Sequence, residues 1–78
     1  MTLQEWQDKN NGADPTKRVK VRIPGVGEGW LVSVKHHGTG QWVAWIGGPS
    51  YNILRGGPVT PVPIKNYNDL LSWEVLSD

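Results

Sequence analysis

The sequence predicts a mainly β fold, between all-β and α+β, in which about five short strands form a small bent sheet or barrel. Three observations support this. Apolar and polar residues alternate with a period of two, glycine and proline turns recur at short intervals, and the chain has only 78 residues. This length allows one domain, 1–78, with a short helix over 3–10 and a β-rich body over 17–76.

The composition indicates how such a small core is held together. The chain has no cysteine and no phenylalanine but five tryptophans. Disulfides and thiolate zinc sites are therefore excluded, and large aromatic rings must supply much of the buried area. We expect Trp6, Trp30 and Trp45 to lie in the core.

The N-terminal segment predicts a short helix. Thr2 and Glu5 have the spacing of a capping box, while Leu3 and Trp6 share one helical face. A helix of this length is unstable alone, so it must dock through these two apolar residues.

The first strand has the clearest alternation in the chain. Val19, Val21 and Ile23 form one face, and the intervening positions form a cationic face. Its basic residues are Arg18, Lys20 and Arg22.

The remaining elements follow from similar patterns. We expect strands over 30–36, 41–46, 51–55 and 72–76, a hairpin turn over 37–40, and a helical turn over 66–71. The segment 59–64 is extended, and its two prolines place it at a sheet edge or outside the sheet.

This order of strands, with a loop, a hairpin and a helical turn before the last strand, resembles an SH3-like small barrel. The resemblance concerns architecture alone, and the chain carries no residue motif of such a family. It therefore implies a fold and no site residues.

Charge is unevenly distributed along the chain. Residues 15–66 carry seven bases against one acid, whereas residues 1–14 and 67–78 are acidic. This segregation predicts contact with phosphates through Lys17, Arg18, Lys20, Arg22 and Lys35. The alternative is a solvated face whose lysines protect the sheet from aggregation.

Trp42 and Tyr51 are the aromatic residues we expect to support binding. The alternation of side chains along a strand places Trp42 on the face opposite to Val43 and Trp45. Tyr51 follows a turn. An exposed ring stacks on a nucleic-acid base or anchors a protein partner. The alternative is that these rings only fill the core.

Chemistry beyond binding has little support. His36 and His37 point to opposite faces of a strand and cannot chelate a metal together. The glycine-rich segment 25–29 precedes a strand rather than a helix, which argues against a nucleotide site. We expect no enzyme, no cofactor and no metal.

The sequence therefore predicts a small binding module that contacts nucleic acid or a nucleic-acid-bound protein machine. One alternative is a protein of the phage or mobile-element type that binds and inhibits a host protein machine, such as a defence system. Another is a small phage structural subunit. The expected location is cytoplasmic, because no secretory signal or membrane segment is evident.

Overall fold

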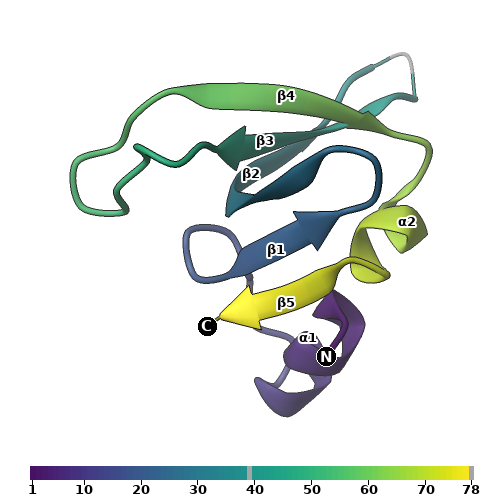
Figure 1. Cartoon of the computed structure of the whole chain (residues 1–78). Coiled ribbons are helices and arrows are strands. Elements are labelled where there is room, and N and C mark those ends of the chain that lie inside the picture. Colours follow the sequence, from purple (N-terminus) through teal and green to yellow (C-terminus); the bar gives the residue numbers. More distant parts are fainter. Residues whose placement is uncertain (39, 78) are drawn as a thin grey trace.

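The computed structural model describes residues 1–38 and 40–77. Five antiparallel strands form one sheet with the order β4-β3-β2-β1-β5, and two short helices accompany it (Figure 1). The mainly β prediction is confirmed. The elements are α1 (Leu3–Lys9), β1 (Lys20–Ile23), β2 (Gly27–His36), β3 (Trp42–Gly47), β4 (Val59–Ile64), α2 (Tyr67–Leu71) and β5 (Glu74–Ser77).

The sheet is strongly bent and is not closed into a barrel. The first part of β2 pairs with β1 and the second part pairs with β3, with a register shift between Leu31 and Ser33. Such an irregularity bends a strand and increases its twist. α2 lies between β4 and β5 in the chain, as the SH3-like order predicts (Figure 1).

The N-terminal helix has the predicted cap. The backbone N–H of Glu5 donates to the Thr2 hydroxyl over 3.2 Å, and the Glu5 carboxylate accepts from the Thr2 N–H over 2.8 Å. Leu3 and Trp6 are buried, as the helical spacing predicts. The Leu3 N–H also donates to the Trp73 carbonyl over 2.8 Å, which fastens the helix beside the start of β5.

The core lies on one side of the sheet, where both helices contribute to it. β1 presents its predicted apolar face to this core. The buried residues are Leu3, Trp6, Val19, Val21, Ile23, Leu31, Ala44, Ile46, Val62, Leu70 and Trp73.

The expectation that Trp30 and Trp45 lie in the core is wrong. Ala44 and Ile46 are both buried in the core, so Trp45 between them points to the other face of the sheet. Trp30 precedes the buried Leu31 on β2, so the side chain of Trp30 also points to the face opposite the core. Both tryptophans are half-buried.

The segment 51–55 is not the expected strand. It forms a turn in which Asn52 and Gly56 make an isolated bridge. The strand that takes its place in the sheet is β4, which lies at the sheet edge as its prolines require. The turn expected at 37–40 includes Thr39, which lies outside the described residues.

In the described part of the chain, neither helix is long and apolar enough to cross a membrane.

Candidate binding face of the sheet

The face of the sheet opposite the core carries aromatic rings and three cations, with two carboxylates beside them. We call it the outer face and define it by the register of the strands, because paired residues point to the same side. Neither helix of the described chain covers it, since their buried residues belong to the core. Its side chains are Lys20, Arg22, Glu28, Trp30, Ser33, Lys35, Val43, Trp45, Val59, Pro61, Pro63 and Glu74.

Three aromatic residues take neighbouring positions in the register of the outer face. Trp30 pairs in register with Gly47, and Trp45 lies two residues before that glycine on the same side of β3. The ring of Tyr51 occupies the space that a side chain at Gly47 would fill. Tyr51 therefore folds back from the β3–β4 loop onto the sheet, beside Trp30.

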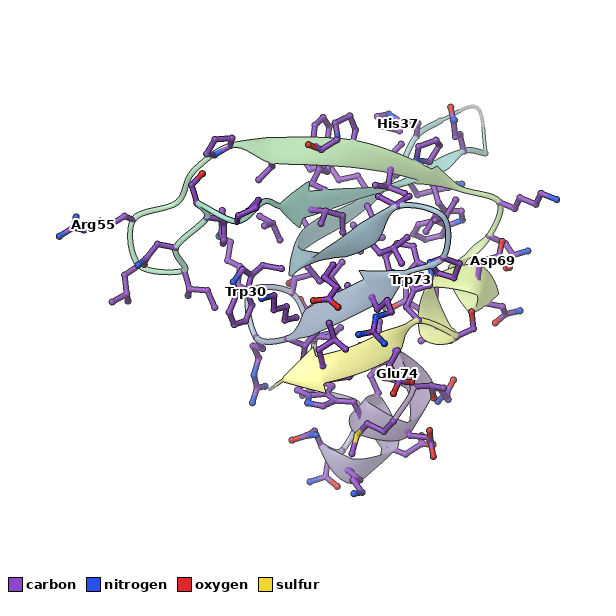
Figure 2. The ribbon with its side chains drawn as sticks, in the orientation of Figure 1. Trp30, His37, Arg55, Asp69, Trp73 and Glu74 are labelled. Carbon is purple, nitrogen blue, oxygen red and sulfur yellow. The ribbon has the colours of Figure 1, made fainter. Side chains whose placement is uncertain are left out.

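A hollow of about 190 Å³ adjoins this aromatic group. Lys20 and Trp30 line it from the sheet, and Gly48 and Pro49 line it from the β3–β4 loop. Figure 2 shows Trp30 on the side of the molecule from which that loop extends. Glu28 also lines it, so the hollow brings a cation, a carboxylate and a ring together at one place.

The cations of the outer face differ in their partners. The Arg22 guanidinium donates to the Glu28 carboxylate over 2.8 Å, and Glu74 pairs in register with Arg22. This bond from Arg22 lowers the pKa of Glu28 and raises that of Arg22. Arg22 is therefore partly neutralised. The chief unpaired cations among the described outer-face residues are Lys20, which is half-buried, and Lys35, which is exposed.

Two predicted site residues lie elsewhere. The Arg18 guanidinium lies 5.3 Å from the ring centroid of Trp6 on α1, which is a cation–π arrangement. Lys17 has a positive φ of 63° and donates its backbone N–H to the Leu31 carbonyl over 2.7 Å. Both residues are exposed, but their contacts tie them to the turn before β1.

Trp42 is half-buried and points to the core side, away from the outer face. Its ring lies 4.5 Å from that of His36 and 5.4 Å from that of Tyr67, between centroids. Together with Tyr67, Leu70 and Gln7 it lines a separate hollow of about 440 Å³. Trp42 and Tyr51 therefore belong to opposite faces of the sheet.

The structure thus places Lys20, Arg22, Lys35 and Tyr51 of the predicted site on one face of the sheet, and Lys17, Arg18 and Trp42 elsewhere. It adds Trp30 and Trp45, which the sequence assigned to the core. The small side chain of the buried Ala44 could have indicated which face of β3 packs on the core, since it leaves room there for larger core residues. The register shift in β2 has no comparable sequence signal.

Residues 1–38 and 40–77 contain no group of three or more histidine, cysteine, aspartate or glutamate side chains placed to hold a metal ion. Comparison with protein-family models, with curated proteins and with solved structures finds no match for this chain.

Proposed function

We propose that this protein is a non-enzymatic nucleic-acid-binding module that holds a single strand on the outer face. The observation that carries the proposal is the arrangement of Trp30, Trp45 and Tyr51 beside Lys20 on a face that neither helix of the described residues covers. Proteins that bind single strands combine aromatic platforms with nearby cations in this way.

The rings supply the contact with the bases. Stacking of a base on an aromatic side chain contributes about 1–3 kcal/mol. Trp30, Trp45 and Tyr51 are half-buried, so their orientations are restricted before a ligand binds and little side-chain entropy is lost. A single strand is favoured over a duplex, because its bases are free to leave their own stack.

The lysines supply the contact with the phosphates. Lys20 pairs in register with Trp30, and Lys35 lies further along the same strand. If these two lysines neutralise about two phosphates, the plot of log binding constant against log salt has a slope of about −1.4 for a single strand. Arg22 contributes less to phosphate binding, because its guanidinium already forms an ion pair with Glu28.

A fluorescence anisotropy titration tests the proposal with labelled oligothymidine, its RNA counterpart and a DNA duplex at two salt concentrations. We expect binding to the single strands that weakens with salt. Lys20→Gln and Lys35→Gln should reduce the affinity, while Lys9→Gln, on exposed α1, serves as the charge control.

The aromatic contribution needs its own matched pair of variants. Trp45→Leu removes an outer-face ring, and Trp42→Leu removes a half-buried ring from the opposite face. Loss of one stacked base should weaken binding about tenfold in the first variant and not in the second. Absence of binding at low salt, or equal effects of the two variants, would reject the proposal.

One observation favours a second candidate function, the binding of a protein. Leu54 in the β3–β4 loop is 92% exposed, and Ile53 beside it is 40% exposed. Exposed apolar anchors of this kind are typical of protein interfaces. Trp42 does not belong to this patch, since it lies on the core side of the sheet.

A further inference from the structure

The hollow beside Trp30 contains a carboxylate, which a surface that only attracts phosphates does not need. It measures about 190 Å³, and Lys20 on β1 and Glu28 on β2 line it together with the tryptophan. Gly48 and Pro49 of the β3–β4 loop complete its wall. Pockets for drug-sized molecules measure about 300–1,000 Å³, so this hollow suits one small ring.

Glu28 keeps one of its carboxylate oxygens free. The Arg22 Nε and Nη2 atoms both donate to Glu28 Oε2, over 3.3 Å and 2.8 Å, and within residues 1–38 and 40–77 no hydrogen bond reaches Oε1. The hydrogen bond from Arg22 lowers the pKa of Glu28, and the charge of Lys20 lowers it further. The carboxylate is therefore ionised at neutral pH, and Oε1 can only accept a hydrogen bond.

Lys20 brings a donor to the same hollow. Its side chain is half-buried and forms no ion pair with another described residue. Lys20 also pairs in register with Trp30, so the ammonium group and the ring belong to the same face of the sheet. The hollow thus offers an occupant one acceptor, one donor and one aromatic ring.

This combination matches the edge of cytosine. The N4 amino group of cytosine is a donor from which carboxylate side chains accept in nucleic-acid complexes, and N3 beside it is an acceptor. Uracil and thymine carry the O4 carbonyl in place of N4, so their oxygen would face the carboxylate with no proton between them. Adenine and guanine have amino groups too, but their second ring needs more room than a hollow of this size provides.

We propose that the hollow selects cytosine from a bound single strand. The N4 amino group donates to Glu28 Oε1, N3 accepts from the Lys20 ammonium group, and the base lies against the ring of Trp30. The inference rests on the proposed function, because it concerns one base of a strand held on the outer face. It gives Glu28 a role that phosphate binding cannot, since a carboxylate repels phosphates.

Anisotropy titrations with oligomers of deoxycytidine and of deoxyuridine, equal in length, test this inference. The two oligomers share one backbone and differ only at the C4 and N3 positions of the base. A slightly alkaline buffer keeps cytosine neutral. We expect the deoxycytidine oligomer to bind about tenfold more tightly, because a hydrogen bond to a charged group is gained in one case and an unpaired acceptor is left in the other.

Glu28→Ala should bring the ratio of the two affinities close to one. The change also frees Arg22 to attract phosphates, which acts on both oligomers alike, so the ratio alone reports on the base. Glu74→Ala is the matched control, because Glu74 pairs in register with Arg22 but does not line the hollow. Both glutamates are exposed, so neither change should unfold the chain.

The inference and the proposed function can fail separately. Equal binding of the two oligomers, tighter binding of a deoxyadenosine oligomer, or a ratio that persists in Glu28→Ala would overturn the selection of cytosine and leave single-strand binding in place. Failure of every oligomer to bind at low salt would overturn the proposed function and this inference with it.

Discussion

The ring of Tyr51 lies on the backbone of Gly47, in the space that any larger residue at position 47 would need for its Cβ atom. Gly47 pairs with Trp30 on β2, so the glycine is what allows Tyr51 to join the aromatic group of the outer face. A loop residue thereby becomes part of the sheet surface. This contact connects the β3–β4 loop to the proposed nucleic-acid site.

Gly47→Ala should displace Tyr51 and weaken single-strand binding several-fold. The new methyl group overlaps the ring, so the loop must move at a cost of about 1–3 kcal/mol in the free energy of unfolding. The measurement is oligothymidine affinity together with urea unfolding. Gly48→Ala is the matched control, because an added Cβ there meets no atom within 4 Å. Equal behaviour of the two variants would contradict this role of Gly47.

Arg18→Gln should lower stability and leave nucleic-acid affinity nearly unchanged. The Arg18 guanidinium lies over Trp6, and a cation–π contact at an exposed site contributes about 0.5–1 kcal/mol. Urea unfolding and anisotropy titration of the same variant separate the two effects. A large loss of affinity at constant stability would show that Arg18 belongs to the binding site.

Thr2→Ala should destabilise the fold through α1. The substitution removes the acceptor for the Glu5 N–H and breaks the capping box, which costs about 1 kcal/mol. In a domain of this size the melting temperature should fall by about 4–8 °C. Thr2→Ser keeps the hydroxyl and should retain most of the stability. A Thr2→Ala chain that melts with the wild type would mean that the cap contributes nothing.

Acidification should weaken the fold through Glu5 and Glu28. Hydrogen bonds from Thr2 lower the pKa of Glu5, and the bond from Arg22 lowers the pKa of Glu28. A carboxyl whose pKa is lowered by folding stabilises the native state above its unfolded pKa, and this contribution is lost as the pH falls through the folded pKa. We therefore expect stability to decline below about pH 4.

Urea unfolding at neutral and at acidic pH measures this decline. The double variant Glu5→Gln and Glu28→Gln should lose less stability on acidification than the wild type, because neither position then binds a proton. An equal decline in both chains would assign the effect to other carboxyls.

Local patterns predicted much of the fold. The capping box of Thr2 and Glu5 and the alternation of Val19, Val21 and Ile23 depend on neighbouring residues, so the sequence reveals them directly. The two prolines of β4 likewise predicted that this segment lies at an edge of the sheet. The turn at 51–55 was missed because Ile53 and Leu54 resemble strand residues, whereas Asn52 and the glycines determine the conformation.

The binding face was predicted only in part. The cations Lys20 and Lys35 follow from alternation, but the pairing of Arg22 with Glu28 depends on the hairpin that joins β1 to β2. The positions of Trp30 and Trp45 depend on which face of each strand meets the helices. That choice is made by packing between distant segments, and apart from the small side chain of Ala44 the two-faced apolar strand β3 carries no local sign of it.

The indole N–H signals of the five tryptophans provide the most direct test of the proposed binding face. We expect a titration of ¹⁵N-labelled protein with oligothymidine, followed by two-dimensional NMR, to shift the indole signals of Trp30 and Trp45. Those of Trp6 and Trp73, buried in the core, should stay in place. Shifts confined to Trp42, or no shift in any indole at saturating oligonucleotide, would contradict the proposal that the outer face holds the strand.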